Sequence, residues 1–321
     1  MGVTCEQVAV GVSGKSQPAW VVRAPLVSCR MRVSLAGGRI GPTESLETMA
    51  RREGALAAIN GCFFDAYVSG AVKLPWHNLM RDGELLHIGN TGTTLGWTDG
   101  GAYCMEPVKA VVRGTVANPG GPGSWYAYLV NHPGAAALFT SRWYKQSAGG
   151  SVTVRLSDGR VHSVSSGEQT IPSDGVLLSI GSAEHSMASR FKPGAAVNWR
   201  VEWERSDRPD WWRNVRQAIG CGPRLVSRGQ PVDTAVSEGF RDRKILNAAG
   251  ARSAVGITAS GEVLMVCASG TIAQMAQVMA RLGAVDAMNL DGGASSCLWV
   301  NGRYMRAPGR LISNALCLLP A

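Results

Sequence analysis

Residues 271–296 read TIAQMAQVMARLGAVDAMNLDGGASS and combine the signals of a helix, a strand and a polar loop. Thr271 and Gln274 have the spacing of a capping box, and apolar side chains then recur with helical period as far as Gly283. This pattern predicts a helix that ends at the glycine. The apolar run 284–290 then predicts a buried strand, which delivers the polar residues 289–296 at its end.

Outside this stretch, short β-branched runs alternate with turn dipeptides such as Asp82-Gly83, Asp99-Gly100, Asp158-Gly159 and Asn301-Gly302. Such dipeptides commonly close hairpins between neighbouring strands. We therefore expect an α+β fold with a largely antiparallel or mixed β-sheet core and a few inserted helices. We expect a single domain over residues 1–321, with a β-rich insertion at roughly 105–215.

Several stretches of the sequence predict particular local structures. Residues 8–12 and 19–33 are each predicted to form an early strand. Thr43 has the character of an N-cap for a helix that ends at Gly54. The polar stretch 206–213 contains a proline and two tryptophans, and we expect it to form an exposed loop.

The composition excludes wholesale disorder, because 45% of the 321 residues are hydrophobic and only 17% are charged. The net charge of +9 favours an anionic substrate or a polyanionic surface, although solvated arginine-rich faces explain it equally well. No clustered basic stripe or known motif supports a nucleic-acid partner. No apolar run is long enough to predict a membrane span.

The eight cysteines form no C-x-x-C pair and none lies near a histidine at zinc-ligand spacing, which argues against a structural zinc site. Cys267, Cys297 and Cys317 lie in apolar runs and are expected to be small core residues. Residues 1–6 lack the features of a signal peptide. Two interpretations remain: a cytoplasmic protein, or an exported one whose leader is absent from this sequence, in which a Cys5–Cys29 disulfide could form.

The loop 289–296 is the first candidate site. Asn289 and Asp291 end a buried strand, Gly292 and Gly293 allow close backbone approach to a ligand, and Ser295 and Ser296 follow. Successive amides in such a turn can bind an anion, and Asp291 could act as a nucleophile, a base or a metal ligand. Taken alone, the same letters also describe an ordinary hairpin turn with local Asx-type bonds.

A second polar loop, NGCFFD at residues 60–65, also follows a predicted buried strand. Its phenylalanines need no ligand to explain them, but Asn60 and Asp65 at the mouth of an apolar strand require polar partners. Farther along, Arg224 and Arg252 could each grip a phosphate with two hydrogen bonds, although an ordinary salt bridge is the simpler interpretation for either arginine. Glu238 lies between these two arginines.

Five motifs occur in a characteristic order: NGCFFD (60–65), GCGPRLV (220–226), ARSAVG (251–256), NLDGGASS (289–296) and RLISNAL (310–316). Together they resemble the phosphodiester glycosidases, whose patterns include NGGFF or NGTFF, GPRL, PRTAVG and LDGGGSS. The resemblance implies the fold of that family. It also implies active-cleft roles for Asn60, Asp65, Arg224, Arg252, Asn289, Asp291, Ser295 and Ser296. Gly292 and Gly293 would have structural roles and would let the backbone come close to the ligand. Ala294 replaces a third glycine, which puts a complete anion-binding turn in doubt.

The reaction implied by the resemblance is hydrolysis of the bond between a sugar's C1 and a phosphate, in a glycoconjugate or an anionic cell-surface or cell-wall polymer. A carboxylate beneath C1 would stabilise or attack an oxocarbenium-like centre. Asp291 is the first candidate for this carboxylate, with Asp65 or Glu238 as the base that activates water. Arg224 and Arg252 would hold the phosphate, and Ser295, Ser296 and Asn60 would orient oxygens. Members of the family are usually exported, which favours a secreted or cell-surface protein.

Two alternatives remain open from the sequence. A metal-assisted phosphodiesterase would use Asp65, Asp291 and Asn289 to bind a hard cation such as Ca²⁺ and would attack phosphorus. A non-catalytic module for anionic glycopolymers would use Trp211 and Trp212 as its platform. The histidines are scattered; His77 and His87 flank a predicted hairpin near the first motif and could line the cleft, although residues of this kind are more often satisfied core or surface groups.

Overall fold

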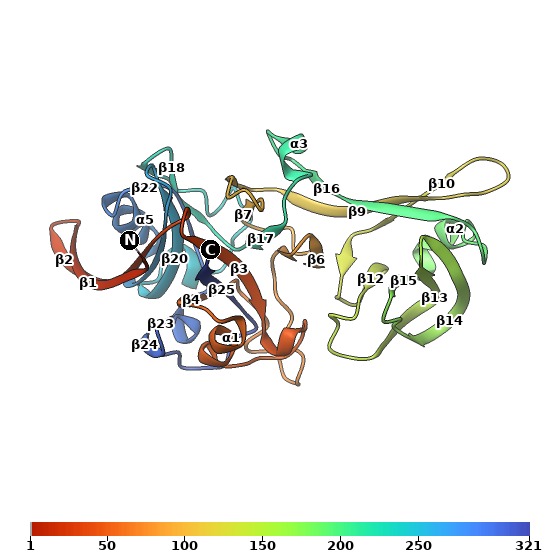
Figure 1. Cartoon of the computed structure of the whole chain (residues 1–321), viewed down its shortest axis with the longest axis horizontal. Helices are drawn as coiled ribbons and strands as arrows, with labels where there is room; N and C mark the ends of the chain where they lie inside the picture. Colours follow the sequence, from red (N-terminus) through yellow and green to blue (C-terminus); the bar gives the residue numbers. More distant parts are fainter. Residues whose placement is uncertain (1) are drawn as a thin grey trace.

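Antiparallel strands make up most of the regular structure of the molecule (Figure 1). The structure is a computed structural model, and it describes residues 2–321. The largest sheet has seven strands in the order β1 (Thr4–Val12), β2 (Lys15–Pro25), β21 (Glu262–Gly270), β20 (Gly250–Thr258), β22 (Ala284–Asn289), β18 (Arg224–Ser227) and β19 (Gln230–Pro231). Helix α5 (Ile272–Arg281) packs on this sheet through buried Met275, Val278 and Met279. The predicted capping box of Thr271 and Gln274 is present.

Two five-stranded sheets complete the body of the molecule. One has the order β24 (Arg303–Arg306), β23 (Leu298–Val300), β4 (Ala57–Asn60), β25 (Asn314–Pro320) and β3 (Cys29–Leu35). The other has the order β6 (Glu84–His87), β5 (Leu79–Arg81), β17 (Gln217–Gly220), β7 (Thr94–Trp97) and β8 (Tyr103–Glu106). One continuous apolar core joins these two sheets to the seven-stranded sheet.

Residues 109–204 form an inserted lobe, which projects from the body on the long strands β9 (Lys109–Val116) and β16 (Val197–Glu204) (Figure 1). These strands belong to a three-stranded sheet with the order β10 (Gly123–Ala127), β9 and β16. A five-stranded sheet has the order β11 (Leu129–Val130), β12 (Ala136–Phe139), β15 (Gly175–Ile180), β13 (Ser147–Ser157) and β14 (Arg160–Thr170). Among the ladders of the described strands, only β11 with β12 is parallel. The expected α+β, largely antiparallel fold is therefore confirmed.

The remaining helices are short. They are α1 (Leu46–Glu53), α2 (His185–Ala188), α3 (Pro209–Trp212) and α4 (Arg243–Leu246), with 3-10 turns at Ala36–Gly38, Ser182–Glu184 and Gly293–Ser295. No helix in the part of the chain that the structure describes is long and apolar enough to cross a bilayer.

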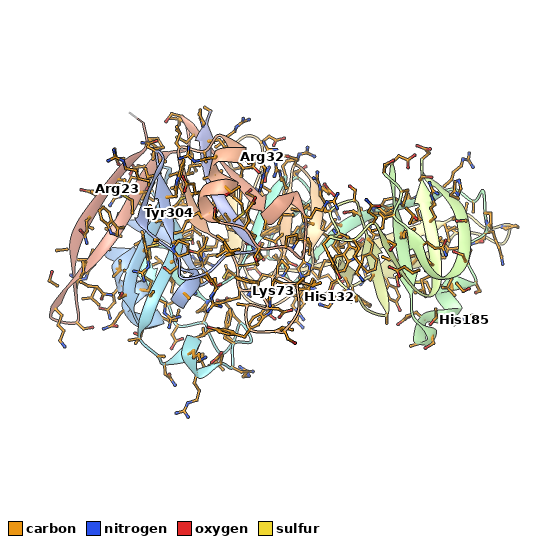
Figure 2. All side chains as sticks on the ribbon, turned by 90° about the horizontal axis from the view of Figure 1, so that it is seen from below. Arg23, Arg32, Lys73, His132, His185 and Tyr304 are labelled. Atoms are coloured by element: carbon orange, nitrogen blue, oxygen red, sulfur yellow. The ribbon has the colours of Figure 1, made fainter. Side chains whose placement is uncertain are left out.

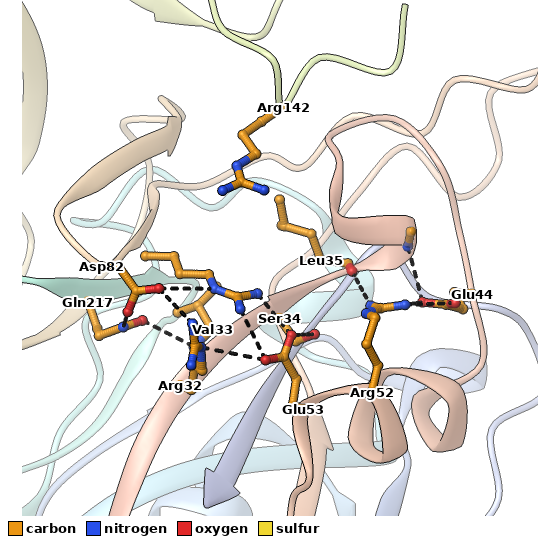
Figure 3. Close-up of polar contacts among 12 residues, drawn as sticks. Arg32, Val33, Ser34, Leu35, Glu44, Arg52, Glu53, Asp82, Arg142 and Gln217 are labelled. Carbon is orange, nitrogen blue, oxygen red and sulfur yellow. Dashed lines mark hydrogen bonds and ion pairs between the residues drawn. The ribbon is translucent and has the colours of Figure 1, made fainter. Parts of the chain in front are cut away.

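An ion-pair network joins α1 to two of the sheets (Figure 3). The nearly buried Glu53 carboxylate contacts Arg81 at 2.8 Å and Arg32 at 3.5 Å. Arg32 also pairs with Asp82 at 2.7 Å, and Gln217 donates to the other oxygen of that carboxylate. The network therefore fixes β3 and the end of α1 against the sheet that contains β5 and β17.

Three local predictions were wrong for identifiable reasons. Residues 19–33 form two strands, because a turn in which the Ser28 amide donates to Pro25 at 3.0 Å separates them and exposes Val27. The first helix begins later than expected. Its N-cap is Ser45, whose side chain accepts from the Thr48 amide, and not Thr43.

The third error concerns residues 206–213, which contain helix α3 and are not simply an exposed loop. Trp212 is fully buried, stacks on Trp203 with ring centres 4.7 Å apart, and donates its indole N–H to Glu106. The proposed binding platform of Trp211 and Trp212 is therefore absent, because Trp212 belongs to the core of the lobe and its junction.

Candidate active site

The loops after β4 and β22 are bonded directly to each other. The backbone amide of Asp291 donates to the carbonyl of Gly61 at 2.9 Å. The side-chain amide of Asn60 donates to the carbonyl of Asp291 at 2.6 Å. Two predicted motifs that are more than two hundred residues apart in sequence thus form one structural unit.

Asn60 is the centre of a buried polar network. Its Oδ1 accepts from the Ser253 hydroxyl at 2.7 Å and from the Cys297 amide at 3.0 Å. The Ser253 and Ser296 hydroxyls lie 2.7 Å apart. Because Asn60, Ser253 and Ser296 are all almost completely buried, they position the loop and do not line its surface.

Asn289 also faces the interior. Its side-chain amide donates to the carbonyls of Gly222 at 3.1 Å and Leu290 at 2.6 Å, and the side chain has no exposed surface. The Asn289 carbonyl accepts from the Gly222 amide at 2.9 Å. This residue therefore ties the turn before β18 to the end of β22.

The glycine pattern of the loop explains why Ala294 is tolerated. Gly293 adopts a left-handed conformation with φ of 60°, whereas Ala294 is not among the residues with positive φ. A Cβ at Gly292 would lie 2.7 Å from the carbonyl oxygen of Ala251, so this position requires close backbone approach. The family's third glycine is therefore replaced at a position where the backbone conformation suits alanine.

A pocket of about 340 Å³ opens above this loop. Asp291, Gly292, Gly293 and Ser295 form one side, and Arg252 lies beside them. The rest of the wall comes from the largely aromatic segment that follows β4, from the segment around α4, and from Arg310, which lies before β25. These residues are Phe63, Phe64, Ala66, Tyr67, Trp76, Asp242, Lys244, Ile245, Ala248, Ala249, Gly250, Ala251 and Arg310.

Asp291 is one of the two carboxylates that line this pocket, the other being Asp242, and it is half-buried. Burial raises its pKa to about 6, while hydrogen bonds from Ser295 and the Gly292 amide and the nearby Arg310 and Arg252 cations oppose the rise. The Gly292 amide donates to Oδ1 at 2.8 Å. A carboxyl group with this pKa can be held in either protonation state near neutral pH.

Arg252 is buried, and Nε and Nη2 of its guanidinium donate to backbone carbonyls of the protein. Nε donates to the Gly270 carbonyl at 3.2 Å, and Nη2 donates to the backbone carbonyls of Lys244 at 2.9 Å and Ala248 at 2.7 Å. The guanidinium therefore anchors the segment around α4 that forms a wall of the pocket, while its charge acts on Asp291.

Arg224 and Glu238 do not line this pocket. They also do not line the adjoining pocket, which contains Asp65. Arg224 forms an ion pair with Asp286, the simpler arrangement considered from the sequence. Glu238 accepts from the Arg224 amide at 2.8 Å and from the Thr234 hydroxyl, and burial raises its pKa. Arg224 therefore joins β18 to β22, and Glu238 joins the segment after β19 to the start of β18.

Asp65 lies in an adjoining pocket of about 500 Å³, which shares Trp76, Asp242 and Ile245 with the first. The Trp76 indole donates to Asp65 Oδ1 at 2.6 Å, so the tryptophan stands between the two carboxylates. We call the two hollows the Asp291 pocket and the Asp65 pocket.

Three histidines line the Asp65 pocket. Burial lowers the pKa of His77 to about 4 and that of His87 to about 3, which keeps both imidazoles neutral. His77 Nδ1 lies 2.7 Å from the Thr91 carbonyl and therefore carries the proton. His132 belongs to the inserted lobe, and Figure 2 shows it where the lobe meets the body.

The residues of the Asp291 pocket that sequence reasoning missed include Tyr67, Lys244 and Arg310. Arg310 opens the RLISNAL motif and Tyr67 lies two residues beyond Asp65, so both were within reach of a motif search. Lys244 lies outside all five motifs and had no signal.

The set of ligands considered for a metal is not assembled in one place. Asp291 and Asp65 line different pockets, and the Asn289 side chain bonds to backbone carbonyls in the interior. Within residues 2–321, no group of three or more His, Cys, Asp or Glu side chains is arranged to hold a metal ion.

Comparisons with known proteins give a consistent family and fold. A model of the family described as phosphodiester glycosidase matches residues 149–319, slightly more than half of the chain. No curated protein sequence matches. A hypothetical protein from Synechocystis superposes with a TM-score of 0.85 at 23% identity, covering 100% of this chain and 62% of its own. The chain thus spans less than two thirds of that relative.

Two further solved structures are similar. A protein from Burkholderia pseudomallei, described as exported, has a TM-score of 0.76 at 20% identity and covers 97% of this chain and 76% of its own. The catalytic domain of zebrafish N-acetylglucosamine-1-phosphodiester alpha-N-acetylglucosaminidase, auto-inhibited by its pro-peptide, has a TM-score of 0.49 at 15% identity. It covers 99% of this chain and 82% of its own.

Proposed function

The chain belongs to the phosphodiester glycosidase family, and we propose that it hydrolyses the bond between C1 of a sugar and the phosphate of a sugar-1-phosphodiester. The observation that carries this proposal is the half-buried Asp291 carboxyl group in a pocket with cationic side chains and aromatic walls. An aromatic wall suits a sugar face, cations suit a phosphate, and a carboxylate suits the positive charge that develops at C1.

In the proposed reaction, ionised Asp291 lies beside C1 and stabilises the oxocarbenium-like transition state or forms a bond to it. The bond from C1 to the phosphate oxygen breaks, and its electron pair leaves with the phosphate. Phosphate is a good leaving group, so little general-acid assistance is needed. Water then supplies a hydroxyl group to C1 and releases a proton.

We assign activation of this water to Asp65, which lines the neighbouring pocket across Trp76. Glu238 is the weaker candidate for the base, because it lies outside both pockets and one of its oxygens is engaged by Arg224 and Thr234. Ser295, which lines the Asp291 pocket, would help to orient the carboxylate, while Asn60, Asn289 and Ser296 would act by fixing the loop.

The test is release of free sugar from an α-linked sugar-1-phosphodiester in ¹⁸O-labelled water. The native chain should place the label in the sugar, because C1–O cleavage puts solvent oxygen on carbon. Asp291→Asn should retain the fold and lose turnover, whereas Asp233→Asn, an exposed carboxylate outside both pockets, should remain active. Label in the phosphate would instead indicate attack on phosphorus and would contradict the proposal.

We also propose that the natural substrate is a glycoconjugate or an anionic cell-wall polymer outside the cytoplasm. The support is the likeness to a protein described as exported. Fractionation of cells that produce the complete protein would test this, and activity confined to the cytoplasmic fraction would contradict it.

A further inference from the structure

We propose that Lys244 and Arg310, held beside Tyr67 at the mouth of the Asp291 pocket, bind the phosphate group of the ligand. This inference rests on the proposed function for the rest of the substrate, but the binding of phosphate itself can be measured without turnover. The ligand class is a phosphate ester, recognised by one ammonium and one guanidinium group.

The geometry brings the two cations together from distant parts of the chain. The Arg310 guanidinium carbon lies 4.5 Å from the centre of the Tyr67 ring, and Nη2 donates to the Tyr67 hydroxyl at 2.8 Å. The Lys244 ammonium lies 5.6 Å from the centre of the same ring. All three residues line the Asp291 pocket. One tyrosine therefore sets the positions of both charges relative to the pocket.

These two cations differ from the other arginines considered for phosphate binding. Arg224 is paired with Asp286, and Arg252 donates to three backbone carbonyls. Within residues 2–321, neither Lys244 nor Arg310 forms an ion pair with a carboxylate. Their charges remain available to an anion that enters the pocket.

The arrangement contributes little to the stability of the fold. Tyr67 is 82% exposed and Lys244 is also exposed, and cation–aromatic contacts at such exposed positions contribute little to the free energy of folding. A ring that orders two like charges at the surface is better explained by a ligand that both charges contact, because the ligand's negative charge removes their mutual repulsion.

The charge of the pocket also suits a phosphate ester. Its lining contains Lys244, Arg252 and Arg310 against Asp242 and Asp291. Arg310 acts on the Asp291 carboxyl group from its own side of the pocket. A phosphate beside Arg310 and Lys244 would thus lie next to the carboxylate proposed to face C1, as the two ends of a single C1–O–P linkage require.

The experiment measures binding of inorganic phosphate to the whole chain by calorimetry at low ionic strength. Lys244→Gln and Arg310→Gln should each raise the Kd about tenfold, since each removes one charged contact. Arg243→Gln is the matched control, because this exposed arginine precedes Lys244 on α4 but does not line the pocket, and its Kd should stay within about twofold of the native value.

Three results would overturn the inference: no saturable phosphate binding by the native chain, native-like binding by both glutamine variants, or an equal loss in Arg243→Gln. If Arg310→Gln unfolds, Tyr67→Phe tests the same site, because it removes only the hydroxyl that accepts from Arg310, and it should weaken phosphate binding by about threefold. A phosphate site without sugar release would leave this inference standing while refuting the proposed function, so the two failures are distinguishable.

Discussion

The side-chain amide of Asn60 donates to the backbone carbonyl of Asp291 across 2.6 Å, and the Asp291 amide in turn donates to Gly61. The residue that carries the proposed catalytic carboxylate is therefore held at both its amide and its carbonyl by one neighbouring loop. Because Asn60 is almost fully buried, this constraint comes from the core of the molecule. The position of the Asp291 carboxylate should consequently depend on residues that no ligand touches.

Replacement of Asn60 by Ala tests that dependence. The Ser253 hydroxyl and the Cys297 amide would lose their shared acceptor inside the core, and an unsatisfied buried group costs about 1–3 kcal/mol. We expect urea denaturation to show a loss of stability of that order, with a fall in kcat. Asn214→Ala, at an exposed site, should change stability by less than about 0.5 kcal/mol. Equal effects of the two substitutions would contradict the structure.

Gly61→Ala should be strongly destabilising for a steric reason. A Cβ at this position would lie 1.9 Å from the Asn314 side-chain oxygen, which itself accepts from the Cys62 amide. Overpacking of this kind costs about 1–3 kcal/mol, and we expect a lower denaturation midpoint of corresponding size. Gly100→Ala is the control, since the nearest atom would be 3.8 Å away, and it should leave the midpoint nearly unchanged.

The pH dependence of activity follows from the raised pKa of Asp291. If the ionised carboxylate serves C1, kcat/KM should rise as pH increases through about 6 and then level off. The pH–rate profile of the free enzyme measures this directly. A profile that falls above pH 6 would show that the protonated form is the active one and would require a different role for Asp291.

The same pKa predicts how Asp291 affects stability. A carboxyl group whose folded pKa of about 6 exceeds its ordinary value of 3.8 destabilises the fold progressively as the pH rises from the ordinary value to the folded value, and by the full amount above it. Asp291→Asn should therefore be more stable than the native chain at pH 8, by roughly 1–3 kcal/mol, and about equal to it at pH 3.5. Thermal denaturation at the two pH values measures the difference, and an advantage that is the same at both would refute this explanation.

Glu53 offers a test of the network that joins α1 to the sheets. Its nearly buried carboxylate contacts Arg81 and Arg32, so Glu53→Gln should leave two cations undercompensated and cost about 2–4 kcal/mol in chemical denaturation. Glu47→Gln removes an exposed i,i+4 pair with Arg51 on the same helix and should cost less than about 0.5 kcal/mol. Similar costs for the two variants would contradict the network.

Local sequence signals predicted much of the fold. The capping box at Thr271 and the Asp-Gly hairpins were correct, because a cap or a tight turn depends on residues within four positions of one another. The break after Pro25 and the burial of Trp212 were missed. The break combines the local turn between Pro25 and Ser28 with a bond from the Leu26 amide to the distant Gly261 carbonyl, and the burial of Trp212 depends on a bond from its indole to the distant Glu106.

The candidate site was predicted as a set of motifs but not as a surface. Five of the residues that the motifs named line one pocket: Asp291, Gly292, Gly293, Ser295 and Arg252. They could not separate these from Asn60, Asn289 and Ser296, because beyond the end of a strand the alternation of side-chain directions is lost. The sequence could not identify Lys244, because its position in the pocket depends on the Arg252 side chain, which donates to the Lys244 backbone carbonyl.

Leu129 and His132 of the inserted lobe line the Asp65 pocket, whereas the Asp291 pocket is built entirely from the body. The lobe thus contributes residues to one pocket and none to the other. Mutations in the lobe can accumulate and alter what fits beside Asp65 while the loop that carries Asp291 stays unchanged. Such a division would let related enzymes diversify their ligands without reinventing their chemistry.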